Sequence, residues 1–165
     1  MLRKTEISTL MSFLALLIVL TPGCLYDDND ATFMYWVAEK VKEVIEFDAE
    51  VLDAMTEQDY DKLEALADIA SSKSYEYYEK VQGFSVSTSD GKELKKHATL
   101  LFYYHHKAES NLKKYAQYMK ELEYETTSYY SDISFDYFDK VVNETKIVED
   151  ILSKHGIEFE ITTGK

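Results

Sequence analysis

The chain is poor in helix-breaking residues and in cysteine: its 165 residues include five glycines, one proline and one cysteine. A sheet protein needs a turn roughly every eight to twelve residues, so this scarcity argues against an all-β fold. A single cysteine cannot close an internal disulfide, and no Cys/His cluster with the spacing of a zinc site occurs. Because long helices need few breakers, the composition favours an all-α protein.

Positive charge is also in short supply. The 18 lysines and arginines face 31 aspartates and glutamates, which leaves a net charge of −13. Such a surface repels phosphate backbones, so we predict that the protein does not bind nucleic acid. It gives no attraction to anionic lipid headgroups either. Any contact with a membrane must therefore come from a hydrophobic group.

The N-terminus has the pattern of an export signal. Arg3 and Lys4 precede residues 7–20, which carry no charge and of which eleven are apolar. A membrane-spanning helix needs about 20 apolar residues, and this run ends sooner, at Pro22 and Gly23. A basic start, a short apolar core and small residues before a cleavage site are typical of a signal peptide. We therefore predict a signal peptide over residues 1–23.

The stretch Leu20-Thr21-Pro22-Gly23-Cys24 resembles the lipobox of prokaryotic lipoprotein signal peptides. The glycine before the cysteine fits that pattern, whereas the leucine stands four residues before the cysteine instead of three. The resemblance implies cleavage before Cys24, acylation of Cys24 and a mature protein on the outer face of the cytoplasmic membrane. Two acyl chains anchor a protein stably where one barely does. We expect a lipidated tether over residues 24–30, with the lipid bilayer as partner.

The remaining chain resembles small helical archaeal lipoproteins of unassigned activity, although only the lipobox supplies a motif. Apolar residues recur at three- and four-residue steps, which indicates amphipathic helices. Four segments show this pattern: Asp30 to Met55, Thr56 to Gly83, Gly91 to Glu123, and Asp132 to Lys154. Short links between them predict an up-down-up-down four-helix bundle over residues 31–156. If the tight link at 55–56 fails to turn, the first two helices fuse and the bundle is lost.

The ends of these helices carry capping residues. Thr56 with Asp59, and Asp90 with Glu93, match the capping-box spacing. The acids of residues 27–30 are interpreted as solvated caps. A calcium loop over residues 28–39 is disfavoured because Phe33 stands where such a loop requires glycine. Residues 157–165 form a C-terminal tail; its alternating start, IEFEI, suits a short strand or an extended segment, and we favour the latter because nothing strand-like is available to pair with it.

The histidines do not match a known metal motif. His97 and His105 would lie about 12 Å apart along one helix, and His105 and His106 would point about 100° apart. Glu109 follows these two at helical spacing, so either pair could hold a metal weakly. Di-iron bundles need Glu-x-x-His motifs, and none occurs. We predict no metal site and no cofactor.

An up-down-up-down bundle brings several residues to the end near Cys24. These are Met34, Tyr77, Tyr78, His97 and His155. A methionine on the first helix and a histidine on the last loosely resemble haem ligation in four-helix b-type cytochromes, so we keep this group as a candidate ligand site. Methionine is, however, ordinarily a core residue.

Fourteen tyrosines, paired at 77–78, 103–104 and 129–130, suit either an aromatic groove for a ligand or helix seams with wet hydroxyls. We favour the seams, because the pairs straddle the predicted apolar stripes.

The sequence indicates a binding protein more than an enzyme. It contains no nucleophile motif, phosphate loop or distinct carboxylate dyad. Asn143 begins a glycosylation sequon, which matters only if the host modifies exported proteins. We therefore expect a non-catalytic binding or scaffold module for an unidentified protein partner. The alternative is a helical bundle that binds a small ligand, haem or a metal at the cell surface.

Overall fold

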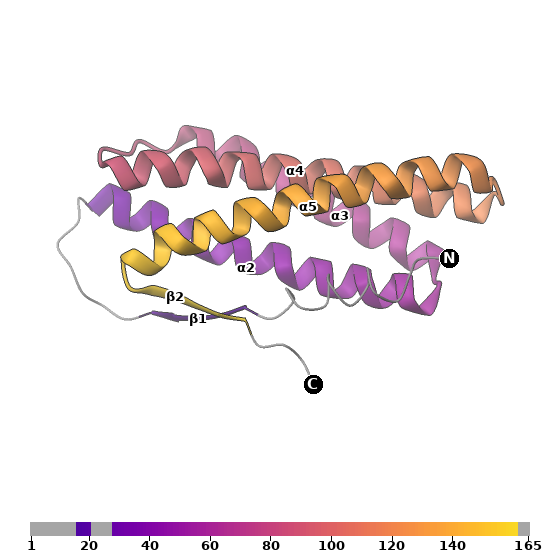
Figure 1. The fold of residues 1–165 in the computed structure, drawn as a ribbon, viewed down its shortest axis with the longest axis horizontal. Coiled ribbons are helices and arrows are strands. Elements are labelled where there is room, and N and C mark those ends of the chain that lie inside the picture. The colour runs from indigo at the N-terminus through magenta and orange to yellow at the C-terminus, as the bar shows by residue number, and fades with distance from the viewer. Residues whose placement is uncertain (1–15, 21–27, 162–165) are drawn as a thin grey trace.

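The computed structural model describes residues 16–20 and 28–161 and confirms the all-α four-helix fold. Figure 1 shows four long helices, each antiparallel to the one before it. Their bounds are α2 Asp28–Glu57, α3 Tyr60–Gly83, α4 Ser89–Lys120 and α5 Tyr124–Lys154. Cys24 and most of the predicted signal peptide lie outside the described residues. Of the helices described, none is long and apolar enough to cross a membrane.

The link between α2 and α3 turns within two residues, so the helices do not fuse. Gln58 adopts a left-handed conformation with φ of 57°, and Asp59 caps α3 by accepting a hydrogen bond from the Lys62 amide at 3.0 Å. The predicted capping box is wrong in its first member. Thr56 remains inside α2, where its hydroxyl donates to the carbonyl of Leu52 at 2.9 Å.

The link between α3 and α4 is held by Asp30, which is fully buried rather than solvated as predicted. Its carboxylate accepts hydrogen bonds from the Ser87 and Thr88 amides, each at 2.9 Å, and from the Thr88 hydroxyl. That hydroxyl also caps α4 by accepting from the Gly91 amide, so Thr88, not Asp90, is the cap. Burial raises the pKa of Asp30, but the hydrogen bonds outweigh it and the net shift is downward.

The last link is shorter than predicted. The fourth helix was predicted to begin at Asp132, yet α5 begins at Tyr124, and the chain turns at residues 121–123. In this turn Leu122 is left-handed at φ of 61° and exposed. Thr127 lies near the start of α5, where its hydroxyl donates a hydrogen bond to the carbonyl of Glu123 at 2.8 Å. This local bond offsets the weak helix propensity of threonine.

The core consists of two apolar clusters, one toward each end of the bundle. The first contains residues from the start of α2 and from the facing parts of the other helices, including Phe33, Val37, Leu101 and Leu152. The second lies around Leu63 and Leu112. Between the two clusters, buried polar side chains of α3 and α4 and the half-buried Asp48 of α2 form a polar layer. We define this polar layer by its members Asp48, Ser71, Ser74, His105 and Glu109.

The helices do not pack equally. α4 packs closely against α3 and α5, whereas α2 approaches α3 and makes fewer close approaches to α4 and α5. Small residues explain the close α3–α4 seam, because they let the two backbones come together. The buried ones are Ala67, Ala70, Ser71 and Ser74 on α3, and Ala98, Ala108 and Ala116 on α4. α2 is thus the helix least tied to the others through its backbone.

A small sheet lies beside the helices and differs from the expected extended tail. β2, Ile157–Ile161, pairs antiparallel with β1, Leu16–Leu20, with Ile18 opposite Phe159 (Figure 1). Ile157 is buried in the first apolar cluster. The sequence analysis found no partner strand because it assigned residues 16–20 to the signal peptide.

Candidate functional site

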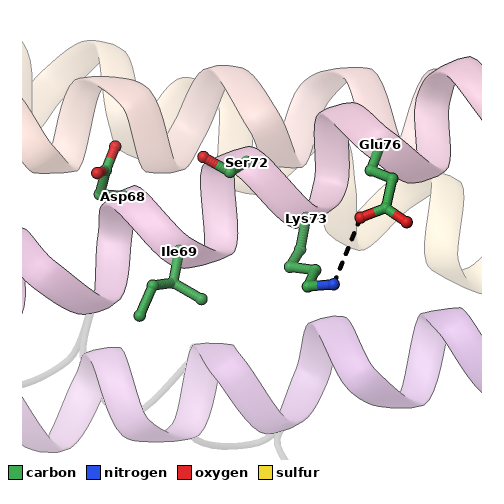
Figure 2. A pocket seen from close by; sticks show the side chains of 5 residues that line it. All are labelled: Asp68, Ile69, Ser72, Lys73 and Glu76. Carbon is green, nitrogen blue, oxygen red and sulfur yellow. Dashed lines mark hydrogen bonds and ion pairs between the residues drawn. The ribbon is translucent and has the colours of Figure 1, made fainter.

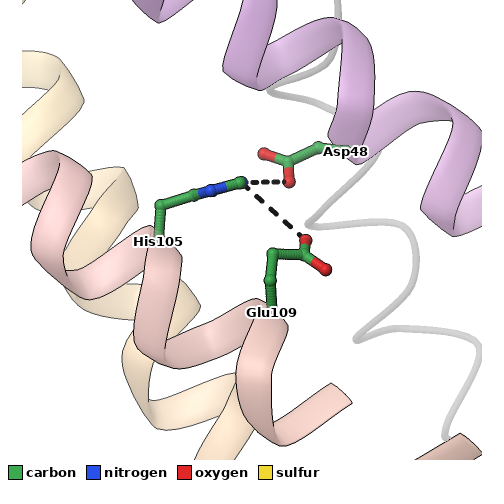
Figure 3. Close-up of side chains that lie close together, drawn as sticks. All are labelled: Asp48, His105 and Glu109. Atoms are coloured by element: carbon green, nitrogen blue, oxygen red, sulfur yellow. Dashed lines mark hydrogen bonds and ion pairs between the residues drawn. The ribbon is translucent and has the colours of Figure 1, made fainter. Parts of the chain in front are cut away.

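The polar layer brings three ligating side chains together at mid-bundle. His105 and Glu109 lie one turn apart on α4, and Asp48 reaches them from α2 (Figure 3). One oxygen or nitrogen from each lies within 4.8 Å of the other two. His105 and Glu109 are completely buried, while the side chain of Asp48 keeps 16% exposure. Water or an ion can therefore approach the cluster only past Asp48.

Both ring nitrogens of His105 are engaged, which fixes the orientation of the imidazole. Nδ1 lies 2.6 Å from the Ser74 hydroxyl of α3, and Nε2 lies 2.8 Å from Oδ1 of Asp48. Oε1 of Glu109 is farther from Nε2, at 3.8 Å, which is beyond a hydrogen bond. His105 therefore directs Nε2 at two carboxylates and joins α2, α3 and α4.

Glu109 is the anomaly of the site. Neither of its carboxylate oxygens has a hydrogen-bond partner in the structure, although both are buried. Burial raises the pKa of Glu109 well above its ordinary value, and the negative charge of Asp48 raises it further. A buried charge without a partner is costly, so the side chain must carry a proton or lie beside a cation.

A second hydroxyl–imidazole contact extends the polar layer along the α3–α4 seam. The Ser71 hydroxyl lies 3.0 Å from Nδ1 of His106 and 2.7 Å from the hydroxyl of Ser110. Burial lowers the pKa of His106, and the positive charge of Lys107 acts in the same direction. Nδ1 of His106 also lies 3.1 Å from the carbonyl oxygen of Ser71, to which it can donate a hydrogen bond. These contacts hold two helices together and leave no open position for a ligand on that nitrogen.

Ser74, His105 and Asp48 have the residue types of a hydrolytic triad. Ser74 and His105 are both completely buried, however, so a substrate cannot reach the hydroxyl. The serine also contacts Nδ1 of the imidazole and the aspartate contacts Nε2, the reverse of the arrangement in serine proteases. The arrangement therefore does not support nucleophilic catalysis.

The residues of the predicted ligand site are only partly brought together. Met34 and Tyr77 lie in the first apolar cluster, against which Tyr78 packs from a half-buried position. His97 contacts Oε2 of Glu144 at 2.7 Å, and His155 contacts Oδ2 of Asp90 at 2.9 Å. Each histidine thus ties α5 to α4 through a carboxylate.

The predicted site contains a further buried polar contact. Tyr77 donates its hydroxyl to Glu43, and burial together with this bond raises the tyrosine pKa. These polar contacts orient the side chains for packing between helices rather than toward a common ligand. Asn143, the predicted glycosylation site, is exposed on α5. Its glycosylation remains a prediction.

Five tyrosines form a band of adjacent rings across α3, α4 and α5. The rings of Tyr75, Tyr78, Tyr103, Tyr104 and Tyr137 follow one another at centroid distances of 5.7–6.1 Å. Tyr75 is exposed and the other four are half-buried. This tyrosine band fits the prediction that the tyrosines border the helix seams. All five residues remain at least partly exposed.

The surface also has a shallow hollow of about 230 Å³ on α3 (Figure 2). Its lining residues are Asp68, Ile69, Ser72, Lys73 and Glu76, all exposed and all from one helix. Lys73 and Glu76 pair at 3.3 Å beside it. A hollow formed by one exposed helix face does not enclose a small ligand, so it does not define a site.

The helical spacing of His105 and Glu109 is visible in the sequence, whereas the contribution of Asp48 is not. Asp48 lies on another helix, and only the relative register of α2 and α4 places it beside His105. Within the sequence, the one available signal was an aspartate next to the apolar stripe of α2. Comparison with known proteins finds no matching family model, no curated protein and no solved structure with significant similarity.

Proposed function

We propose that the protein is a lipid-anchored, extracytoplasmic helical bundle that acts as a non-catalytic binding module at the membrane surface. The lipobox-like stretch supports the anchor, and so does the beginning of α2 at Asp28, four residues after Cys24. Four residues span at most about 14 Å. A lipid on Cys24 would therefore hold one end of the bundle close to the bilayer. That end also contains the last turns of α3 and α5 and the first turn of α4 (Figure 1).

The charge of the chain supports a lipid rather than an electrostatic attachment. A net charge of −13 gives no attraction to anionic headgroups, whereas buried acyl chains bind without regard to charge. Cleavage before Cys24 would remove β1, because residues 16–20 precede the cysteine. The pairing of β1 with β2 would then belong to the unprocessed chain, and Ile157 would still hold the start of β2 in the core.

The tyrosine band is the observation that carries the binding role. Tyrosine is enriched at protein interfaces, because its ring supplies contact area at a low entropic cost and its hydroxyl remains satisfied in water. Lys107 lies over the ring of Tyr103, and Lys140 over those of Tyr104 and Tyr137, so the band also carries positive charge on an otherwise acidic protein. A protein partner with apolar and acidic groups suits this face.

A Cys24→Ser variant tests the anchor. We expect the natural protein to partition into the detergent phase of a membrane extract and to be cleaved by protease added to intact cells. The variant, which has no thiol to acylate, should accumulate as the unprocessed chain and take up no lipid label. Equal partitioning and equal labelling of both proteins would contradict the anchor.

Site-specific photocrosslinking tests the binding face. A photoreactive residue in place of Tyr75, at the exposed end of the band, should give a discrete adduct on whole cells. The matched control is the same residue at Glu50, which is exposed on α2. The proposal fails if Tyr75 gives no adduct, or if Glu50 gives the same one.

A further inference from the structure

The binding proposal leaves the polar layer unexplained. Glu109 is completely buried with both carboxylate oxygens free of hydrogen bonds, and it lies beside a second carboxylate and an imidazole. Interior carboxylates are ordinarily paired, because an unsatisfied buried polar atom opposes folding. One of these oxygens, Oε1, points toward His105 and Asp48, and the other points away from them (Figure 3).

We propose that Asp48, His105 and Glu109 bind one divalent first-row transition-metal ion, such as Zn²⁺, inside the bundle. The proposal is independent of the lipid anchor, since it involves only contacts between helices. Among the described residues, these three form the one group of three such side chains whose ligand atoms lie within 4.8 Å of one another.

The distances suit an ion after a small adjustment. Zinc binds nitrogen and carboxylate oxygen at about 2.0–2.2 Å, which places neighbouring ligand atoms about 3.4 Å apart in a tetrahedron. Nε2 of His105 lies 2.8 Å from Asp48 and 3.8 Å from Glu109, so the two distances bracket this value. The Asp48 contact must open and the Glu109 contact must close, each by less than about 1 Å.

The ligand types select the class of metal. Imidazole nitrogen suits zinc, iron, cobalt and nickel, whereas magnesium and calcium prefer oxygen ligands and keep several waters. Ser74 supplies the outer contact typical of a metal-bound histidine, because it can accept a hydrogen bond from Nδ1 and leave Nε2 free for the ion. The partial exposure of Asp48 gives the ion an entry path from solvent.

The negative charge of Glu109 can be neutralised either by a proton or by a bound metal ion, and the two differ in charge balance. Without metal, burial and the negative charge of Asp48 favour the protonated form of Glu109, which can share that proton with Asp48. A divalent cation balances both carboxylates at once and releases the proton of Glu109. The ion would also join α2, the helix with the fewest close approaches to its neighbours, to α4 at mid-length. The metal would thus serve as a structural clamp.

Zinc titration of the full-length protein tests this proposal. The protein is extracted in detergent, purified through a histidine-free tag, stripped with a chelator and titrated with Zn²⁺ in a calorimeter. We expect one tight site per chain and a rise in melting temperature. Glu109→Gln keeps the shape of the side chain but loses the anionic ligand, so it should weaken this site by more than about 100-fold, beyond the range of an outer-contact change. Ser74→Ala should weaken it by about 10-fold.

The matched control is Glu144→Gln, which removes the carboxylate of the His97–Glu144 pair. Among the described residues, this pair belongs to no group of three possible metal ligands. It should leave the tight site unchanged, which separates this site from weak binding to surface acids. If Glu109→Gln does not fold by circular dichroism, Asp48→Asn replaces it. Co²⁺ offers an independent readout, because a tetrahedral site gives visible absorption that the Glu109 and Asp48 variants should lose and Glu144→Gln should keep. The proposal is overturned if no one-to-one site is found, or if the Glu109 and Glu144 variants bind Zn²⁺ equally.

Discussion

Glu109 makes stability depend on pH in an unusual direction. Its pKa is well above the ordinary value of 4.5 in the folded protein, so the folded state binds the proton more tightly than the unfolded chain. The stability from this group is complete below the unfolded pKa and is lost as the pH rises toward the folded pKa. Most paired carboxylates have the opposite dependence, because folding lowers their pKa. The free energy of unfolding of the metal-free protein should therefore decrease, through this group, as the pH rises above 4.5.

Glu109→Gln tests this dependence, since glutamine resembles a protonated glutamate that cannot ionise. In chelator, the free energy of unfolding of the natural protein should fall relative to the variant as the pH rises from 5 to 8. The relative slope cannot exceed about 1.4 kcal/mol per pH unit for one proton. Urea denaturation at several pH values measures it. Parallel pH profiles for the two proteins would show that Glu109 is not held protonated.

Asp30 has the usual dependence and the larger structural role. Its net pKa is lowered, so its stabilisation is present above the ordinary value of 3.8 and is lost in acid. Asp30→Ala removes the fully buried acceptor of three hydrogen bonds, which come from the Ser87 and Thr88 amides and the Thr88 hydroxyl. We expect a loss of about 3 kcal/mol at neutral pH, measured by urea denaturation. Asn29→Ala, at an exposed neighbour, should change stability by less than about 0.5 kcal/mol, and an equal loss in both variants would contradict this role.

At the scale of elements, periodicity predicted the helices well and their ends less well. The predicted apolar stripes coincide with the buried faces, as at Val37, Leu63 and Leu101, because burial itself creates the 3.6-residue pattern. Capping residues were displaced by a few positions, since Ser, Thr and Asp are frequent around each link and tertiary contacts choose among them. Thr88 became a cap because Asp30 holds its hydroxyl and amide.

The candidate metal site could not be predicted in full from the sequence, because it also depends on tertiary contacts. His105 and Glu109 share one helix, so their spacing was visible in the sequence. Asp48 and Ser74 come from two other helices, and their approach depends on the register of the packed bundle. A bundle pattern specifies which face is buried but not how far one helix is shifted along another. The sheet was missed for a related reason, because β1 lies within an assigned signal peptide.

Gly91 gives an element-scale prediction that opposes helix propensity. Alanine is favoured over glycine inside a helix by about 1 kcal/mol. A Cβ at Gly91, however, would lie 2.5 Å from Oδ2 of Asp30, far inside van der Waals contact. We expect Gly91→Ala to destabilise the protein by about 1–3 kcal/mol through this overpacking. Thermal or urea denaturation measures the loss.

Two variants separate the clash from a general effect of alanine. In an Asp30→Ala background, Gly91→Ala should become neutral or stabilising, since the clashing carboxylate is gone. Gly83→Ala should be neutral or slightly stabilising in the natural background, because a Cβ there meets nothing within 4 Å. A similar loss at both glycines would point to backbone conformation instead of the contact with Asp30.

At the scale of the whole molecule, α2 connects three features: the end proposed to carry the lipid, the polar layer, and, through α3 and α4, the partly exposed tyrosine band. α2 follows Cys24 directly and is the helix least tied to the others, so any force on the anchor enters the bundle through α2. The contacts of Asp30 and Asp48 hold α2 at its start and at mid-length. With Cys24 acylated as proposed, these two acids would transmit the position of the lipid to the rest of the bundle, including the tyrosine band.

This arrangement predicts how zinc affects backbone motion. Zn²⁺ at saturating concentration should slow hydrogen exchange in the middle of α2, around Asp48, more than in α5, which supplies no ligand. Glu109→Gln should remove this difference, and Glu144→Gln should retain it. Uniform slowing in all four helices would show that zinc stabilises the protein without joining α2 to α4.

The most direct measurement of the central claim is the intact mass of the protein extracted from the membranes of its own host. The account predicts a polypeptide that starts at Cys24 and carries the added mass of lipid, with residues 1–23 absent. A polypeptide that retains those residues and carries no lipid would contradict it.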